Sequence, residues 1–312
     1  MGTYLIRRLI QMPLVLIIIS VMVFGLIHLT PGDPVELALP AGAPAELADA
    51  LRKQFGLDQP LHIQYMDWLW KLLHADIGKS IQTGEPISKM IADRLPVTLL
   101  LATTASLISV AISLLGVIAA IRSHTRIDYF VMLLATAGIS IPNFFAGILL
   151  IVIFGVILGI LPISGFVNPF LDPINGFRHI IMPAFSLGLI YAALLTRMVR
   201  SSMLEVLNED YVRTARAKGL VERAVIMRHA LKNALLPVVT VIAMNYAYML
   251  GGSIIIEQVF ALPGIGRLLI DAVLTRDFPV IQGVLLMVGL MFLLINLAAD
   301  VCYSYIDPRI KY

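Results

Sequence analysis

Few residues of this chain have the types and spacing that chemistry requires. The tripeptide Gly78, Lys79 and Ser80 matches the end of a phosphate-binding loop, but the pattern GxxxxGK[ST] needs a glycine where the chain has Leu73. The six histidines form no HExxH pair, and the single cysteine, Cys302, cannot form an internal disulfide. The sequence therefore predicts no ATP site, no metal site and no cofactor in this chain, and no catalytic residue.

A basic segment between residues 197 and 233 has a pattern that favours docking. Asp210 is a suitable first-turn acid for a helix that runs to Lys218, and Gly219 can take the left-handed conformation that ends a helix. A second basic helix is expected from Glu222 to Leu231. Because the segment is far longer than a connector between two membrane spans needs, we expect something in the cytoplasm to bind it. The alternative is that a long inside loop is basic because of topology alone.

Two sets of residues are candidates for a pathway or a gate. Ser140, Asn143 and Asn245 are uncharged polar residues within apolar stretches, where they either face a passage or bond neighbouring helices. Gly264, Gly266 and Arg267 precede an amphipathic run that is either part of an outer gate or a helix at the lipid interface. Charged residues are absent from the middles of the apolar stretches, whereas proton- and sodium-coupled carriers usually place them there. Any uphill movement of solute should therefore draw its free energy from a separate subunit.

The elements that must position these residues are membrane-spanning helices. Of the 312 residues 59% are hydrophobic and 14% charged, and the mean hydropathy is +0.90, whereas soluble domains carry about a quarter charged residues. A span needs about 20 mostly apolar residues. The sequence predicts an all-α polytopic membrane protein with six spans, which run from Leu9 to Leu29, Val97 to Ile121, Tyr129 to Leu158, His179 to Thr196, Leu235 to Ile256 and Val280 to Ala299. The third holds Gly138, Pro142 and Asn143, which predict a kink.

The distribution of lysine and arginine predicts the orientation. Arg7 and Arg8 precede the first span, and most of the other basic residues in short loops fall on the same side of the membrane, which indicates a cytoplasmic N-terminus. The first span is expected to be an uncleaved anchor rather than a removed signal. Topology therefore accounts for the net charge of +3, and no nucleic acid is needed as a partner.

The segment from Thr30 to Pro96 is predicted to lie outside the membrane and to contain helices. One helix is expected to include Leu47, Leu51 and Phe55, and another to run from Leu61 to His74, before a third leads into the second span. These helices either lie at the membrane interface or help to dock an external partner. The predicted division is residues 1–96, an anchor helix with this external segment, and residues 97–312, a core of five spans with the loop 197–233.

Six blocks of sequence resemble one family of transport proteins. They are TPGDP at 30–34, FGLDQPL at 55–61, RTARAKG at 213–219, GGSIIIEQVFALPGIGR at 251–267, RDFPVIQG at 276–283 and DPRIKY at 307–312. In this order they are similar to the inner-membrane permeases of the dipeptide, oligopeptide, glutathione and nickel ABC importers. The resemblance covers essentially the whole chain and implies the transmembrane domain of a type I ABC importer.

The resemblance also implies partners. It implies a second, similar permease subunit, two ATP-binding subunits that carry ATP and magnesium, a periplasmic substrate-binding protein and the membrane lipid. It maps the ATPase-coupling helix onto Asp210, Arg213, Thr214, Ala215, Arg216, Lys218 and Gly219. Broader members of the importer superfamily begin this motif with Glu-Ala-Ala, where this chain has Arg213, Thr214 and Ala215.

Several functions remain open at this point. Di- or oligopeptides are the leading substrates, and nickel and glutathione are the alternatives within the same mechanism. A different class, an ATP-independent channel or secondary carrier, would need coupling charges of its own, and a non-transporting anchor would need only the long inside loop. Nothing in the spans distinguishes one substrate from another.

Overall fold

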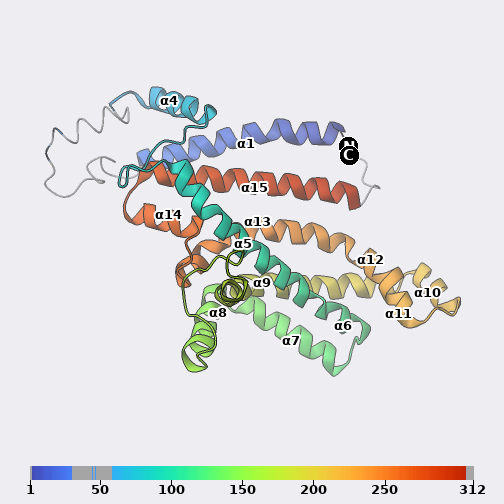
Figure 1. Ribbon diagram of the computed structural model, residues 1–312. Helices are drawn as coiled ribbons and strands as arrows, with labels where there is room; N and C mark the ends of the chain where they lie inside the picture. The colour runs from blue at the N-terminus through green and yellow to red at the C-terminus, as the bar shows by residue number, and fades with distance from the viewer. Residues whose placement is uncertain (1, 30–43, 45, 47–57, 307–312) are drawn as a thin grey trace. The chain divides into compact units, whose positions relative to one another are not determined.

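The computed structural model describes residues 2–29, 44, 46 and 58–306, and these residues form helices joined by loops (Figure 1). Within that part of the chain, β pairing is limited to one isolated bridge between Lys79 and Pro86. The all-α class is confirmed. The expected helix with Leu47, Leu51 and Phe55 lies outside the described residues. The division into residues 1–96 and 97–312 stays a prediction.

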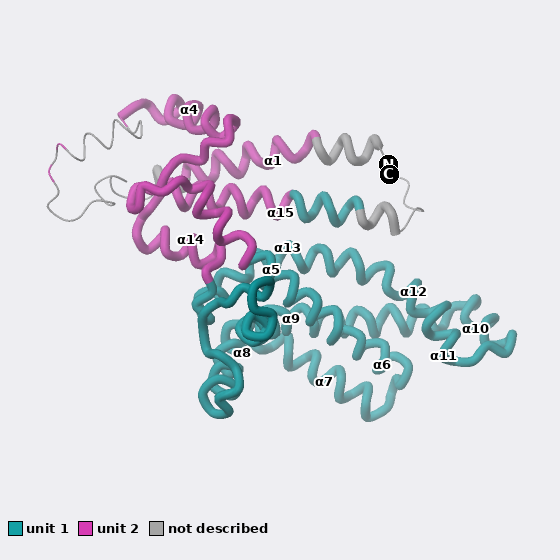
Figure 2. The backbone as a smooth tube through the Cα atoms, in the orientation of Figure 1, with its two compact units in different colours: residues 1, 98–262, 294–312 teal, residues 2–97, 263–293 magenta. Residues whose placement is uncertain are grey.

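The chain divides into two compact units, which are coloured separately in Figure 2. Unit 1 contains residues 98–262 and 294–312, together with Met1, and unit 2 contains residues 2–97 and 263–293. Helices α5 (Ile87–Ser113) and α15 (Phe278–Ile306) contribute residues to both units.

Helix α9 (Pro173–Leu207) is the centre of unit 1. It contacts α6 (Leu115–Ile121), α7 (Arg126–Ser140), α8 (Asn143–Leu150) and α13 (Leu236–Val259). Asp172 caps its start by accepting a hydrogen bond from the Asn175 N–H, and Pro173 occupies the first position, where its missing N–H costs nothing. A buried core surrounds the second half of α9, formed by Val117, Ala120, Leu195, Val199, Met203, Ala230, Ala234 and Val238.

The expected spans correspond to helices, with different bounds. The second begins at Ile87 and continues through α6 to Ile121, and the fourth is a single helix of 35 residues, longer than the stretch from His179 to Thr196. Four helices of the described residues are long and apolar enough to cross a membrane, and a bent pair makes a possible fifth. The apolar part of α1 (Gly2–Leu29) that is described, Ile10–Gly25, is shorter.

The third span is broken, as Pro142 predicted. Helices α7 and α8 meet at Ile141 and Pro142, and the segments Arg126–Ser140 and Asn143–Ile157 are bent by 103°. Ile141 is extended because a residue before proline avoids the helical conformation, and Pro142 cannot donate a helical hydrogen bond. Beyond α8 the chain continues in the π-helical stretch η1 (Ile151–Ile157).

Unit 2 contains α1, α4 (Leu61–Leu73), α14 (Ile265–Leu274), the start of α5 and the first half of α15. The predicted helix from Leu61 to His74 and the predicted amphipathic run after Arg267 are both present. The core joins α5, α14 and α15 through Ile87, Ile91, Ile265, Leu268, Ala272, Val280 and Val284.

Candidate functional site

Helix α10 (Asp210–Ala217) begins immediately after α9 ends. Asn208 is the C-cap of α9 and Glu209 the extended N-cap of α10, so the chain turns within two residues. A small apolar cluster holds α10 in place: Val212 and Ala215 are buried against Val225, and side chains at the end of α9 cover them. Lys218 is the C-cap, and Gly219 follows with φ of +77°, the left-handed conformation that the sequence predicted for it. The connection between α9 and α10 is therefore short and allows little independent movement of α10.

The second predicted helix of this loop exists in three pieces. Helix α11 (Glu222–Ala224) leads into the π-helical turn η2 (Val225–Ala230), and α12 (Leu231–Ala234) continues to α13. Asn233 on α12 donates a hydrogen bond of 2.8 Å to the hydroxyl oxygen of Tyr211 on α10. The two arms of the loop are therefore joined by a polar contact as well as by the apolar cluster.

Arg216 and Glu222 clamp the turn at Gly219 from both sides. Arg216 Nη2 lies 2.8 Å from Glu222 Oε1, and Arg216 Nε lies 3.2 Å from Glu222 Oε2, a two-pronged ion pair. The hydrogen bond from Arg216 lowers the pKa of Glu222 below its ordinary value, and the same bond raises the pKa of Arg216. Arg216 thus stabilises the loop itself, so its charge is not simply presented to a partner.

The predicted coupling residues lie on two faces of α10 and its C-cap, one buried and one exposed. Ala215 is buried, whereas the side chains of Asp210, Arg213, Thr214 and Lys218 are exposed. Arg213 and Asp210 form a loose ion pair of 3.5 Å one turn apart, and the Thr214 hydroxyl donates to the Asp210 carbonyl. Large apolar side chains are exposed beside them in the same loop, those of Tyr211, Leu220, Val221 and Met227. Exposed apolar side chains mixed with charges are typical of a surface that a partner covers.

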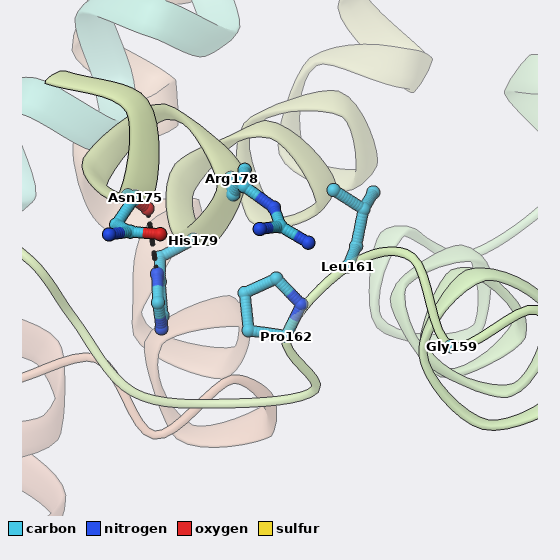
Figure 3. Close-up of a pocket in the computed structure, with 6 residues that line it drawn as sticks. All are labelled: Gly159, Leu161, Pro162, Asn175, Arg178 and His179. Atoms are coloured by element: carbon cyan, nitrogen blue, oxygen red, sulfur yellow. Dashed lines mark hydrogen bonds between the residues drawn. The ribbon is translucent and has the colours of Figure 1, made fainter.

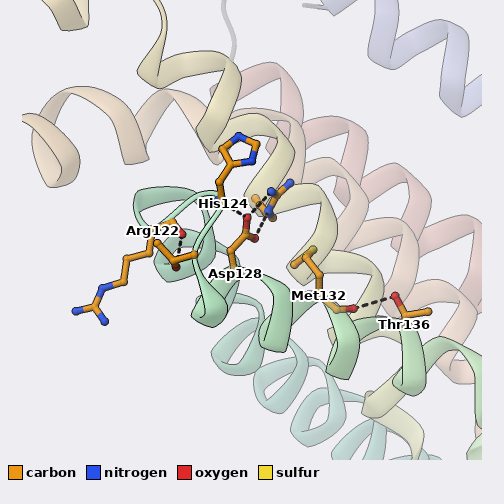
Figure 4. Close-up of polar contacts among 7 residues, drawn as sticks. Arg122, His124, Asp128, Met132 and Thr136 are labelled. Atoms are coloured by element: carbon orange, nitrogen blue, oxygen red, sulfur yellow. Dashed lines mark hydrogen bonds and ion pairs between the residues drawn. The ribbon is translucent and has the colours of Figure 1, made fainter.

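A buried ion pair fixes α7 to α9 three turns before α10. Arg200 donates from Nε and Nη2 to the two carboxylate oxygens of Asp128, at 2.6 and 2.7 Å, and the His124 N–H donates to the same carboxylate (Figure 4). The side chain of Asp128 is only 3% exposed and that of Arg200 is 24% exposed. A buried carboxylate needs this full set of donors. The pair therefore makes the hairpin of α6 and α7 move together with α9.

The candidate pathway residues of the spans lie at two places. Ser140 is exposed at the end of α7 and donates to the Thr136 carbonyl, and Asn143 is half-buried at the start of α8, where its Oδ1 accepts from the Phe144 N–H. The two flank the bend. Asn245 on α13 is buried, and its Nδ2 has no hydrogen-bond partner among the described residues. Ser140 is therefore exposed beside the bend, whereas Asn245 is buried within α13.

Glu257, near the C-terminal end of α13, is fully buried. Its Oε1 accepts from the Thr98 hydroxyl at 2.7 Å and from the Ser253 hydroxyl at 3.1 Å. Thr98 lies on α5, so these contacts join α5 to α13. Polar contacts buried among apolar helices specify one alignment of those helices.

The outer-gate candidates lie at the start of α14. Gly264 is its extended N-cap and Gly266 lies in its first turn, both buried, whereas Arg267 is half-exposed and lies 3.9 Å from Asp271 one turn on. Asp277 follows α14 and is buried. It accepts a short hydrogen bond from the Ser80 hydroxyl and longer ones from the N–H groups of Ile81 and Gln82. The Gly-Lys-Ser loop thus binds an internal carboxylate.

A shallow hollow lies between η1 and the start of α9, in the loop that joins the third and fourth spans. Figure 3 shows the residues that line it, which are Gly159, Leu161, Pro162, Asn175, Arg178 and His179. Arg178 reaches across to donate from Nη2 to the Ile160 carbonyl at 2.8 Å, and His179 Nδ1 lies 2.7 Å from the Asn175 carbonyl. These contacts tie the loop to the helix that follows it.

Comparison with known proteins identifies the family. The family model described as the inner membrane component of binding-protein-dependent transport systems matches residues 112–312, and the model of its N-terminal part matches residues 1–102. The chain belongs to this family. It is a membrane-embedded permease component of a binding-protein-dependent ABC importer.

Curated relatives agree with the permease assignment, and a solved structure has a similar fold. The chain is 44% identical over 314 residues to a protein of Brucella abortus named as a peptide transport system permease, with all of both chains covered. It is 42% identical over 313 residues to the glutathione transport system permease GsiC of Salmonella typhimurium, again with full coverage. The fold matches the methionine ABC transporter MetNI with a TM-score of 0.60 at 19% identity, over 72% of this chain and 99% of that one.

Sequence reasoning missed three polar contacts of the permease. Asp128 with Arg200, Glu257 with Thr98, and Asp277 with Ser80 each join segments that are far apart in the chain. A partial signal existed, because each carboxylate lies close to the end of an apolar stretch, where a charged group is costly unless it is bonded. Nothing in the sequence around Arg200, Thr98 or Ser80 indicated which carboxylate each would bind.

Proposed function

We propose that this permease forms half of the translocation pathway of an ATP-driven importer of di- or oligopeptides, and that α10 is its coupling helix. The observation that supports this most is the construction of the inner loop. An exposed helix with apolar and charged side chains is joined through a two-residue turn to α9, which spans unit 1. A force on α10 therefore acts directly on the central helix.

The proposed coupling residues have distinct parts in this scheme. Asp210, Arg213, Thr214 and Lys218 contact the ATPase from the exposed face, and Ala215 packs α10 onto the loop core. Arg216 holds the angle of the turn through Glu222, and Gly219 allows the turn. ATP binding in the partner closes two ATPase subunits, and α10 converts that closure into movement of the bundle.

The remaining partners follow from the family. A second permease subunit completes the pathway, two ATP-binding subunits carry ATP and magnesium, and a periplasmic binding protein delivers the cargo. This chain holds no cofactor of its own, resides in the bacterial inner membrane with its N-terminus in the cytoplasm, and does not bind nucleic acid. Ser140, Asn143 and Asn245 lie along the pathway, and Gly264, Gly266 and Arg267 belong to the outer gate.

Peptides are the proposed cargo because the relative of Brucella abortus is named for peptide transport. Glutathione is the second candidate, since the Salmonella relative of similar identity is named for glutathione transport. Glutathione is itself a small peptide derivative, so both candidates present amide groups and carboxylates to the pathway. Nickel import would require a binding protein that holds nickel instead of a peptide. The uptake assay below includes nickel for this reason.

Reconstitution tests the proposal. The permease is purified with the subunits that accompany it, placed in vesicles with the binding protein, and assayed for uptake of a dipeptide, an oligopeptide, glutathione and nickel, with and without ATP. We expect concentrative uptake of one of the first two, only with ATP and all subunits. If only glutathione or nickel were taken up, the proposed cargo would be wrong and the proposed ATP-driven mechanism would stand. Concentration of solute by the permease alone, or no ATPase among the accompanying subunits, would overturn the mechanism itself.

A further inference from the structure

Helix α4 packs one face against α1, the helix of the predicted first span. Tyr65 and Trp68 surround Phe24 of α1, with ring centroids 5.3 and 5.9 Å from it, and the Tyr65 hydroxyl lies 2.8 Å from Ser20 Oγ. Leu69 and Leu72 continue the same face at helical spacing and are partly buried. The contact is therefore a specific one, with aromatic packing and a side-chain hydrogen bond.

The position of Ser20 and Phe24 along α1 sets the depth of this contact. The apolar stretch of α1 begins after Arg8 and extends to Leu29, which covers about 30 Å of helix at 1.5 Å per residue. Ser20 lies about 18 Å beyond Arg8 by the same rise, and Phe24 about 6 Å further. Because the hydrocarbon core is itself about 30 Å thick, both residues are at the depth of the leaflet farther from Arg8. A helix that touches them is at that depth too.

A second apolar stripe on α4 is exposed in the part of the chain that the structure describes. Ile63, Met66, Trp70 and Leu73 follow one another at three- and four-residue spacing, and Met66, Trp70 and Leu73 are 63%, 65% and 73% exposed. Asp67 and Lys71 share a different, polar face. The helix thus has three sides: one on α1, one apolar and open, and one charged.

We propose that this open stripe is a lipid-binding surface and that α4 is embedded in the outer leaflet. Helix α1, against which α4 packs, also has exposed apolar side chains, those of Leu14, Ile18 and Met22. The rings of Trp70 and His74 are tilted by 49° with their centroids 4.6 Å apart. An apolar ring and a polar one therefore meet at the end of the helix, as is typical of residues at the boundary between acyl chains and headgroups. Asp67 and Lys71 face the headgroups and water.

The function of such a helix is to anchor the external segment in the membrane. The loop that follows α4 carries Ser80, which binds Asp277 beside α14. The membrane-embedded α4 is therefore connected within a few residues to the proposed outer gate. This inference does not depend on ATPase coupling, because it rests on the contacts of α1 and α4 alone.

The two tryptophans of the chain make the test direct, because both lie on α4, one on each apolar side. Trp68→Phe leaves Trp70 as the reporter of the open stripe, and Trp70→Phe leaves Trp68 as the matched control on α1. Each full-length variant is placed in nanodiscs of phosphatidylethanolamine and phosphatidylglycerol, with or without phosphatidylcholine brominated along its chains, and is titrated with iodide.

We expect brominated lipid to remove roughly half of the Trp70 emission, because its indole lies among the acyl chains, and iodide to have little effect. Trp68 should be quenched less by the same lipid, since protein surrounds it. Strong iodide quenching of Trp70 without quenching by brominated lipid would overturn the proposal. So would a weak response of Trp70 to both quenchers, because this result indicates that protein covers the stripe.

Photocrosslinking in the assembled transporter tests whether a protein, instead of lipid, covers the stripe. A benzoylphenylalanine replaces Trp70 in one variant and Lys71, on the polar face, in another, and both are irradiated in cells that express the complete system. Lipid adducts at position 70 without a crosslinked protein would support the proposal. A crosslink from position 70 to a second permease or to the binding protein would overturn it, whatever position 71 shows.

Discussion

Two carboxylates stabilise turns beside short helices, and they do so in opposite ways. Asp277, after α14, is buried and accepts hydrogen bonds from a hydroxyl and two backbone N–H groups. Glu222, after α10, is 56% exposed, and within the described ranges its side chain is bound by Arg216 alone. Removing a buried acceptor leaves its donors unsatisfied, whereas an exposed ion pair contributes less than about 1 kcal/mol. The turn after α14, on the side expected to be outer, is therefore fixed, and the turn after α10, on the side expected to be inner, is adaptable; they are called the outer and the inner turn below.

The apolar contacts of α14 are also more extensive than those of α10. Helix α14 places Ile265 and Leu268 in a core with large side chains from α5 and α15. Helix α10 places only Val212 and Ala215 against Val225, a much smaller apolar area. Because burial stabilises roughly in proportion to apolar area, α14 is held strongly by its own chain. Helix α10 is left with surface for a partner to cover.

The largest expected effect lies at the ion pair that joins α7 to α9, the helix from which α10 continues. Arg200→Met removes the donors of Asp128, which is 3% exposed, and leaves a buried charge without its pair. We expect a loss of about 3 kcal/mol or more in unfolding free energy. Unfolding of the purified permease in mixed micelles, followed by circular dichroism, measures it.

Two further variants separate charge from geometry at this pair. Arg200→Lys keeps the charge and loses the fork, so its loss should be intermediate. Asp128→Asn with Arg200→Met removes both charges and should recover part of the stability. Equal stability of all these variants and the wild type would show that the pair does not hold α9, and the adaptable turn after α10 would then not adjoin a fixed helix.

The next effect tests the outer turn. Asp277→Ala leaves the Ser80 hydroxyl and the N–H groups of Ile81 and Gln82 without their acceptor, which should lower the unfolding free energy by about 2 kcal/mol. Asp271→Ala, on the exposed side of α14, is the matched control and should change little. Protease protection of the loop 76–86 in membranes gives a local measurement. A protected loop in Asp277→Ala would contradict a fixed outer turn.

The sequence predicted the parts of this fold that depend on local signals. Apolar stretches located the spanning helices, Pro142 predicted the break of the third span, and Gly219 predicted the left-handed end of α10. Each depends on the residue itself or on its neighbours in the chain. The bounds of the fourth span were too short, because the ends of α9 extend past its apolar middle.

Contacts between distant segments could not be predicted in the same way. Nothing in the neighbourhood of Ser80 indicates Asp277, and nothing near Asp128 indicates Arg200, because only the packing of helices brings them together. Arg216 illustrates the same limit within the predicted site. The family resemblance placed it in the coupling helix, and the structure shows it bound to Glu222 of the same loop.

A smaller effect on stability, with a larger one on coupling, is expected at Gly219. A Cβ at this position meets nothing within 4 Å, so the cost of Gly219→Val comes from the backbone alone, about 1–2 kcal/mol for the left-handed conformation. The loop should relax into another turn, and ATP hydrolysis per molecule transported should rise. Gly219→Asn tolerates positive φ and should stay close to wild type. If valine and asparagine behaved alike, the angle of the turn would have no part in coupling.

The smallest effect is expected at Glu222 itself. Glu222→Gln keeps a hydrogen-bond acceptor for Arg216 and removes the charge, so the unfolding free energy should fall by less than about 1 kcal/mol. The hydrogen bond from Arg216 holds the pKa of Glu222 below its ordinary value of 4.5, so the pair contributes fully above that pH and is lost only as the pH falls through the lower, folded value. Between about pH 6 and 8 the ratio of transport to ATP hydrolysis should therefore show no titration from this pair. A loss as large as that of Asp277→Ala would show that the inner turn is fixed as firmly as the outer one, and α10 would have to move as one rigid piece with α9.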